Sequence, residues 1–233
     1  MPSDDPLLIE RRGPVGWLVF NRPDVGNAMN ARMMEQLPEA WKRFEDDDAV
    51  RAIVVTGRGT SFQTGLDVRQ LSRDPQALRA MSRRTKQADL RLTGWHLGVS
   101  KPVVTAVNGV CAGGGLHFVA DSDLVVAAET ASFLDPHVSL GQVSAFETIG
   151  LARRAAFGAV ARMAFTGAHE RIDARTALRL GWVGEVVAAD RLEERAQELA
   201  EATARHPLSA AARKTALWHA WETGLSDARG MTR

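Results

Sequence analysis

A glycine-rich segment in the middle of the chain restricts its possible folds more than any other feature. The segment runs from Gly109 to Gly115, ends in three consecutive glycines, and lies between an apolar run at 102–107 and a short helical pattern at 116–120. Because glycine has no Cβ, its backbone N–H groups can approach a ligand closely. The start of the following helix adds free donors and a partial positive charge. The segment therefore predicts either a tight strand-to-helix turn or a backbone site for an oxygen that carries negative charge.

Three kinds of glycine-rich site can be compared with this segment. The spacing does not fit the GxGxxG fingerprint of dinucleotide sites, and no Gly-Lys-Ser/Thr follows as in a phosphate-binding P-loop. An oxyanion hole needs only two N–H groups that converge on one carbonyl oxygen. The segment can supply one of them, and the second has to come from elsewhere, for which the polar loop at 61–67 is a candidate. Taken alone, the segment leaves a purely structural turn open.

The hydrophobic pattern predicts an α/β fold, because short apolar runs alternate with helical patterns. Strands are predicted at 7–12, 15–20, 52–56, 102–107 and 124–128, the first two as a hairpin. In the first half of the chain, helices are predicted after an Asn30 cap, near Asp67, from Asp74-Pro75 to Trp95, and at 116–120. Helical patterns resume from about Phe146, with stops at Gly167 and Gly181, and two further helices are predicted at 190–206 and 208–222. Pro38 predicts a kink or a broken first turn in the helix after Asn30.

Composition and charge exclude several classes of protein. The 233 residues are 45% hydrophobic, enough for a sizeable core, and the net charge of +1 argues against a nucleic-acid surface. Cys111 is the only cysteine, so an internal disulfide is impossible and a reducing compartment is indicated. The N-terminus resembles no secretory signal, and no apolar run approaches the ~20 residues of a membrane helix. We expect a cytoplasmic protein that binds neither nucleic acid nor membrane.

Several segments resemble one known family in collinear order. Residues 21–30 are similar to its "NRP…NAL" segment, residues 50–67 to its "VRAIVLTG…FCAGADL" block, and residues 101–123 to "KPVIAAVNG…GGG…CD"; the similarity continues at 127–133 and 165–187. The family is the crotonase, or enoyl-CoA hydratase/isomerase, superfamily of fatty acid metabolism. The resemblance implies a spiral of ββα units over residues 1–188. It also implies a C-terminal helical region at 189–233, shorter than the family's usual one, and homotrimers or dimers of trimers.

The same resemblance implies a site for an acyl-CoA thioester. The backbone N–H groups of Leu66 and Gly114 would form the oxyanion hole, where negative charge develops as an enolate or a tetrahedral intermediate. No separate cofactor and no metal are implied, since coenzyme A is part of the substrate. The positions expected to contact the substrate or its coenzyme A are Arg22, Asn27, Ala28, Gly65, Asp67 and Gly113.

The chain departs from the hydratase pattern at the acid/base positions. His117 and His137 stand where the family's "GGGCEL" and "FGQPE" motifs place two glutamates. We expect a neutral His117, because it begins a helix, and a protonated His137 beside Asp135 or Glu147. Glu147 lies near the place of a catalytic aspartate in family dehalogenases and C–C bond hydrolases. His117, His137 and Glu147 are therefore the candidate catalytic residues.

Three functions fit these residues. The first is an acyl-CoA enzyme of the hydratase/isomerase type with unusual acid/base groups. The second is a hydrolase of a thioester or of a β-dicarbonyl C–C bond, in which His137 and Glu147 activate water. The third is an acyl-thioester binder without turnover. Metal binding by His117 and His137 is disfavoured, because two histidines without a third ligand make a weak site.

Overall fold

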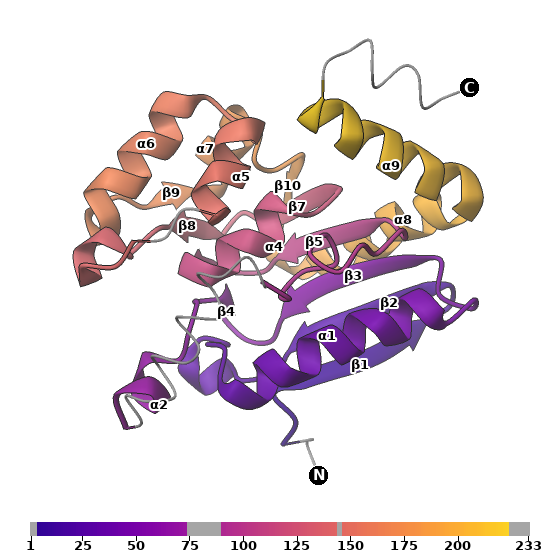
Figure 1. Cartoon of the computed structure of the whole chain (residues 1–233), viewed down its shortest axis with the longest axis horizontal. Coiled ribbons are helices and arrows are strands. Elements are labelled where there is room, and N and C mark those ends of the chain that lie inside the picture. Colours follow the sequence, from indigo (N-terminus) through magenta and orange to yellow (C-terminus); the bar gives the residue numbers. More distant parts are fainter. Residues whose placement is uncertain (1–3, 74–89, 144–145, 224–233) are drawn as a thin grey trace.

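The computed structural model describes residues 4–73, 90–143 and 146–223, and these form two β-sheets with helices around them (Figure 1). The larger sheet has six strands in the order β1-β2-β3-β5-β7-β10, and the smaller has four in the order β4-β6-β8-β9. None of the helices in these ranges is long and apolar enough to cross a membrane.

The larger sheet begins with the predicted hairpin. Its strands β1 (Leu7–Arg12) and β2 (Val15–Phe20) are antiparallel, and each later strand of the sheet runs parallel to its neighbour. These later strands are β3 (Ala52–Gly57), β5 (Val103–Val107), β7 (Leu124–Ala128) and β10 (Glu185–Val187). The strands predicted from the sequence are thus confirmed to within a residue at either end.

The smaller sheet receives the second strand of each successive ββα unit and, beside β8, the short antiparallel strand β9. Its strands are β4 (Ser61–Gln63), β6 (Val110–Ala112), β8 (Ser132–Leu134) and β9 (Ile172–Asp173). Each of the pairs β3–β4, β5–β6 and β7–β8 places its first strand in the larger sheet and its second in the smaller. The helices that follow are α2 (Val68–Arg73), α4 (Leu116–Ala120) and α5 (Phe146–Arg154). This repetition is the ββα spiral that the sequence predicts.

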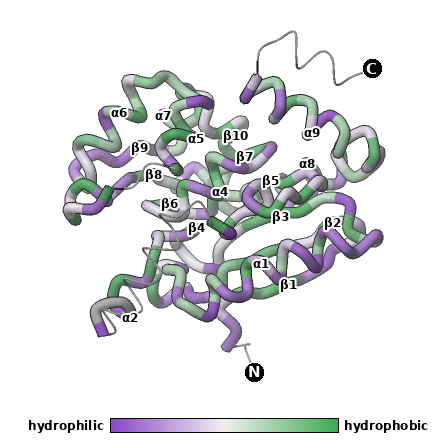
Figure 2. Tube along the Cα trace, in the orientation of Figure 1, coloured by the Kyte–Doolittle hydropathy of each residue, from purple (hydrophilic) through white to green (hydrophobic). Residues whose placement is uncertain are grey.

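Helices cover both faces of the larger sheet (Figure 1). On one face lies α1 (Ala31–Asp46), whose buried residues Met33, Leu37, Trp41 and Phe44 recur at three- and four-residue steps. On the other lies α8 (Leu192–Ala204), which buries Leu192 and three alanines against the strands. The apolar strands sandwiched between these helices form the green centre of Figure 2.

The remaining helices lie at the periphery of this core. They are α6 (Phe157–Thr166), α7 (Ala174–Leu180) and α9 (Pro207–Glu222), and short 3-10 turns occupy Pro23–Val25, Gly113–Gly115, Val138–Leu140, Gly167–His169 and Ala189–Arg191. Gly167 and Gly181 end α6 and α7 as predicted.

The structure corrects two details of the helix prediction. The helix expected from Asp74 to Trp95 is wrong over 90–95, where the chain forms bends and turns, and residues 74–89 lie outside the described ranges. Trp41 Nε1 donates to the Leu92 carbonyl at 2.8 Å, so this carbonyl serves a tertiary contact. Pro38 does not break the first turn of α1, which runs without interruption through it. Burial of the apolar face on both sides of Pro38 offsets its missing hydrogen bond.

Candidate functional site

Two glycine-containing loops touch each other where the units of the spiral meet. A Cβ atom built on Gly65 would lie 3.2 Å from the backbone nitrogen of Gly114, and Gly65 has a φ of +89° that favours glycine. A Cβ atom on Gly114 would in turn lie 3.5 Å from the Gly65 Cα. The structure therefore brings together the two backbone segments that contain the predicted donors, Leu66 and Gly114.

The direction of the Leu66 N–H follows from the pairing of its neighbours. Met29 N donates to the Gly65 carbonyl at 2.8 Å, and Asp67 N donates to the Met29 carbonyl at 2.9 Å. In extended backbone, successive peptide groups point to opposite sides. The Leu66 N–H consequently points away from Met29.

Two buried amide side chains hold the first loop in place. Asn27 is fully buried with a φ of +57°; its side chain accepts from Arg22 N and donates to the Arg58 and Ser61 carbonyls. Gln63, which the sequence analysis did not single out, accepts from Gly65 N at 2.7 Å and donates to the Gly65 carbonyl. These bonds make Asn27 a support of the loop, and its predicted contact with substrate stays a prediction.

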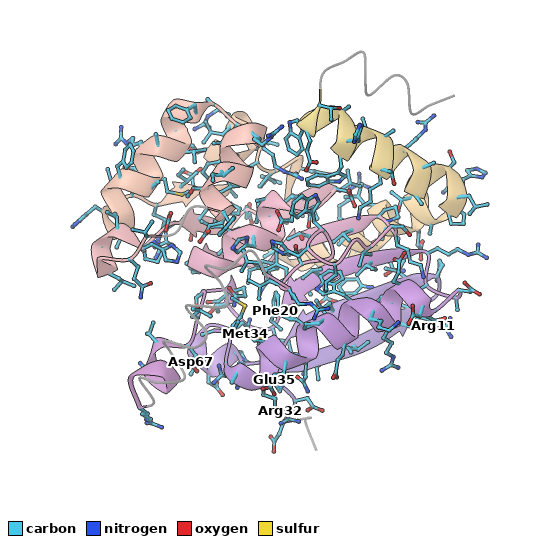
Figure 3. All side chains as sticks on the ribbon, in the orientation of Figure 1. Arg11, Phe20, Arg32, Met34, Glu35 and Asp67 are labelled. Atoms are coloured by element: carbon cyan, nitrogen blue, oxygen red, sulfur yellow. The ribbon has the colours of Figure 1, made fainter. Side chains whose placement is uncertain are left out.

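The charged residues expected near coenzyme A are paired with each other. Arg22 Nη1 lies 2.9 Å from Asp67 Oδ2 and donates to the Ala28 carbonyl at 2.5 Å. Asp67 is largely buried just before α2, and Figure 3 labels it near Met34 of α1. This ion pair ties the segment around Ala28 to the loop that contains Gly65.

His137 lies against the second glycine loop. A Cβ atom built on Gly113 would be 3.6 Å from His137 Nε2, so this nitrogen faces the glycine segment. The other nitrogen, Nδ1, is 2.5 Å from Asp135 Oδ1, which also accepts from the His137 backbone N–H at 3.1 Å. Burial acts to lower the pKa of His137, but the Asp135 hydrogen bond and the charges of Glu147 and Asp135 outweigh it and hold the pKa above its ordinary value.

Glu147 lies between the two histidines. Its Oε1 is 3.6 Å from His137 Nδ1 and its Oε2 is 3.5 Å from His117 Nε2, while its side chain is only 2% exposed. The position results from close packing of α5 on α4, where a Cβ on Gly150 would lie 2.9 Å from the Ala120 Cβ. All three predicted catalytic side chains are thus neighbours, although only His137 is appreciably exposed, at 20%.

His117 faces a carboxylate through each ring nitrogen. Its Nε2 faces Glu147, and its Nδ1 is 3.9 Å from Asp121 Oδ2, one helical turn further along α4. Burial first, and the His137 charge second, lower the pKa of His117 to about 4. A neutral His117 is in line with expectation, but the main cause is burial rather than the helix start.

Beyond Asp121 lie two residues that the sequence analysis missed. Thr93 Oγ1 donates to Asp121 Oδ2 at 2.9 Å and lies 2.7 Å from His96 Nδ1. Burial and the nearby His117 lower the pKa of His96 to about 4, and burial raises the pKa of Asp121 to about 7. The four-residue spacing of His117 and Asp121 is the signal that could have drawn attention to this group.

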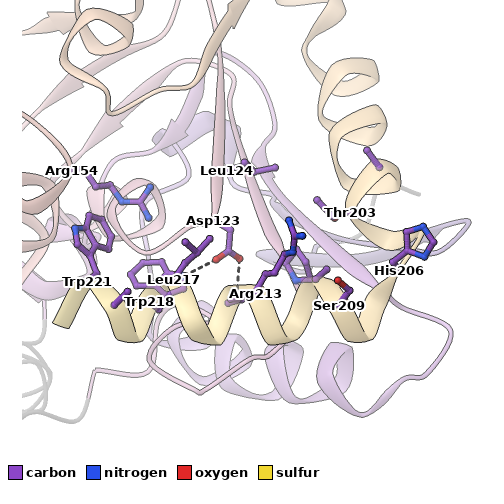
Figure 4. Close-up of a pocket in the computed structure, with 15 residues that line it drawn as sticks. Asp123, Leu124, Arg154, Thr203, His206, Ser209, Arg213, Leu217, Trp218 and Trp221 are labelled. Carbon is purple, nitrogen blue, oxygen red and sulfur yellow. Dashed lines mark hydrogen bonds and ion pairs between the residues drawn. The ribbon is translucent and has the colours of Figure 1, made fainter. Parts of the chain in front are cut away.

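A cavity of about 850 Å³ lies elsewhere, between α9 and the end of the larger sheet (Figure 4). None of the predicted site residues lines it. Its central carboxylate, Asp123, already accepts from Trp218 Nε1 at 2.7 Å and pairs with Lys214 at 3.0 Å. The clustered histidines and carboxylates, not this cavity, form the candidate active site.

Comparison with known proteins shows the family of the chain. The chain is 37% identical over 212 residues to a probable enoyl-CoA hydratase of Rhizobium meliloti, covering 90% of this chain and 79% of the relative. It is 32% identical to the mitochondrial enoyl-CoA hydratase of Pongo abelii, covering 95% of this chain and 76% of the relative.

A solved structure of an enoyl-CoA hydratase/isomerase from Mycobacterium paratuberculosis superposes with a TM-score of 0.86 at 37% identity, covering 97% of this chain and 87% of the other. The enoyl-CoA hydratase of Bacillus anthracis gives a TM-score of 0.86 at 25% identity, covering 97% of this chain and 88% of the other. The family model described as enoyl-CoA hydratase/isomerase matches residues 10–232. The chain therefore belongs to the enoyl-CoA hydratase/isomerase family of the crotonase superfamily.

Proposed function

We propose that this protein is an acyl-CoA enzyme that transfers a proton at the α-carbon of a thioester, with His137 as its acid/base residue. The observation that carries the proposal is the placement of His137: its Nδ1 is held by Asp135 and its Nε2 faces the glycine segment at Gly113. In many enzymes one nitrogen of a histidine base is held by a hydrogen bond, and the other nitrogen faces the reacting group.

In this proposal the N–H groups of Leu66 and Gly114 bind the thioester oxygen. Neutral His137 removes a proton from the α-carbon, or from a water that adds to the β-carbon of an enoyl thioester, and the oxyanion hole stabilises the enolate that forms. The resulting imidazolium, stabilised by Asp135 and Glu147, then returns the proton to carbon. Loss of one such N–H donor typically costs ~3–4 kcal/mol of transition-state stabilisation.

In this proposal His117 and Glu147 are positioning residues. His117 directs both nitrogens at carboxylates, and Glu147 is almost completely buried between the histidines. The proposed enzyme therefore works with one exposed acid/base side chain, in contrast to the two glutamates that the family resemblance associates with hydratases. This arrangement best suits isomerisation, in which one base moves a proton from one carbon to another. It also suits hydration, in which the same base acts in two steps.

A second candidate is hydrolysis of a thioester or of a β-dicarbonyl C–C bond. The observation that favours hydrolysis is the short contact between His137 and Asp135. A carboxylate holds the histidine in this way in enzymes whose histidine activates water. In that reaction water attacks the carbonyl carbon, and the same oxyanion hole stabilises a tetrahedral intermediate.

Hydrogen exchange at the α-carbon tests the proposal directly. Butyryl-CoA incubated with the protein in D₂O should gain deuterium at that carbon, as followed by mass spectrometry. In parallel, crotonyl-CoA and longer enoyl-CoAs should lose their unsaturated-thioester absorbance without release of free thiol. His137→Ala should reduce both rates by ~10²-fold or more, as loss of general-base catalysis does.

The matched control is His169→Ala, which removes an exposed histidine on another part of the molecule. Thiol release, or cleavage of a β-diketone to a carboxylic acid, would favour the hydrolase. Binding of acyl-CoA without exchange or turnover would contradict both reactions and indicate a thioester binder.

We also propose that the chain assembles into a homotrimer or a dimer of trimers through its C-terminal helical region. Apolar side chains on α9 support this, since Leu208 is 87% and Leu217 is 72% exposed in the single chain. Light scattering coupled to gel filtration should give three or six chains per particle. A mass of one chain at micromolar concentration would contradict the proposal.

A further inference from the structure

A second group of ligand-type side chains adjoins the proposed reaction centre through the far nitrogen of His117. It consists of His96, His117 and Asp121, and one ligand atom of each lies within 4.8 Å of the others. We propose that these three residues form a binding site for one divalent transition-metal ion, with Zn²⁺ as the test ion. Two imidazoles and one carboxylate are a ligand set suited to such ions.

The separations between ligand atoms are close to those of a coordinated ion. Asp121 Oδ2 is 3.9 Å from His117 Nδ1 and 3.7 Å from His96 Nδ1. Around a tetrahedral zinc with bonds of about 2.0–2.2 Å, ligand atoms lie about 3.3–3.6 Å apart. Both separations would need to shorten by only a few tenths of an ångström. His96 Nδ1 accepts from Thr93 N at 3.2 Å and would exchange this hydrogen bond for the ion.

The partners of His117 and Asp121 match the surroundings of known metal ligands. Glu147 Oε2 lies 3.5 Å from His117 Nε2, so a proton on Nε2 faces the carboxylate and leaves the lone pair of Nδ1 toward Asp121. Metal-ligating histidines usually present their other nitrogen to a carboxylate in this way. The Thr93 hydroxyl donates to Asp121 Oδ2 at 2.9 Å and would orient that ligand as well.

The backbone holds the three ligands on two fixed elements. His117 and Asp121 are one turn apart on α4 and its C-terminal cap, and the His117 carbonyl accepts from Asp121 N at 2.8 Å. His96 lies in the turn that replaces the expected helix, and its N–H donates to Thr93 Oγ1 at 3.4 Å. This turn is anchored by Trp41, which donates to the Leu92 carbonyl. The site is therefore largely organised before an ion enters.

The burial of the cluster fits a site for an ion that is held by protein ligands. His117 and Asp121 have side chains that are only 7% and 13% exposed, and that of His96 is 10% exposed. The other charged groups that face this cluster are Arg154 and His137, which oppose a cation, and Glu147, which favours one.

The experiment is a Zn²⁺ titration of the chelator-treated full chain by calorimetry, with Co²⁺ absorption spectra as a second readout. We expect one tight site per chain, held by His96, His117 and Asp121. His96→Gln and Asp121→Asn should abolish this site. Glu147→Gln should weaken it by about 10–100-fold, as loss of a partner of a metal ligand does.

His169→Gln and His137→Gln are matched controls that should leave the tight site unchanged, and circular dichroism should verify folding of every variant. The inference is overturned if the native chain binds no more Zn²⁺ than exposed histidines do. It is also overturned if tight binding survives in both His96→Gln and Asp121→Asn. Because binding is measured without substrate, failure of this inference leaves the proposed proton transfer by His137 untouched, and the reverse also holds.

Discussion

At the scale of single residues, the proposed reaction depends on the surroundings of His137. Asp135 and Glu147 oppose the effect of burial and keep the pKa of its imidazole above the ordinary value. Below that pKa the imidazole is charged and cannot act as a base. We therefore expect the rate of α-proton exchange to rise with pH through a value above 6.5, the ordinary pKa of histidine.

Asp135→Asn tests the cause of this pH dependence. Removal of the carboxylate lowers the pKa of His137, so the acidic limb of the pH–rate profile should move to lower pH. The maximal rate should fall as well, because the amide no longer fixes the imidazole in one orientation. Asp173→Asn, at an exposed helix cap, is the control. A profile unchanged by Asp135→Asn would show that Asp135 has no part in the reaction.

At the scale of secondary-structure elements, one cap that the sequence predicts can be measured. The Asn30 side chain accepts from Met33 N at 2.8 Å at the start of α1. Asn30→Ala should lower the free energy of unfolding by about 1 kcal/mol, the usual cost of a lost N-cap. Urea denaturation measures this change, and Asn30→Asp should restore most of the stability because aspartate caps equally well.

Glycine substitutions test the contact between the two loops of the site. A Cβ on Gly115 would lie 2.2 Å from the backbone oxygen of Gln63, so Gly115→Ala must push the β4 end and the glycine segment apart. We expect a loss of acyl-CoA affinity and of turnover. Gly158→Ala is the matched control, because nothing lies within 4 Å of its added methyl group.

This control position is inside α6, where alanine is a better helix former than glycine. Gly158→Ala should therefore stabilise the protein by roughly 0.5–1 kcal/mol without a change in turnover. Equal turnover in Gly115→Ala and the native protein would show that the loop contact does not matter for the site.

At the scale of the whole molecule, stability depends on apolar layers on both faces of the larger sheet. Leu192 of α8 is buried against the face opposite α1, next to strands that include Trp17 and Val54. Leu192→Ala should lower the free energy of unfolding by about 2–5 kcal/mol, as truncation of a buried leucine does. Leu178→Ala on α7, where the side chain is 40% exposed, should cost much less. Similar costs in urea denaturation would contradict this placement of α8.

Much of the fold could be predicted from the sequence because its elements depend on local patterns. The strands at 15–20 and 52–56 are buried throughout, because each is covered on both faces. Their almost continuous apolar sequence therefore has no helical period and predicts a buried strand. The helix pattern failed at 90–95, where Leu92 and Trp95 have helical spacing. There the Leu92 carbonyl is bound by Trp41, a residue 51 positions away that no local pattern can include.

The sequence by itself determined the family, the two glycine loops and the candidate residues His117, His137 and Glu147, because each belongs to a short contiguous motif. Only the tertiary structure decided which of these residues meet. Glu147 contacts both histidines because α5 packs closely on α4 at Gly150 and Ala120. His96 reaches Asp121 because a turn replaces a helix. Such contacts depend on how distant segments pack, and the free energy of that packing comes from the whole core rather than from any one segment.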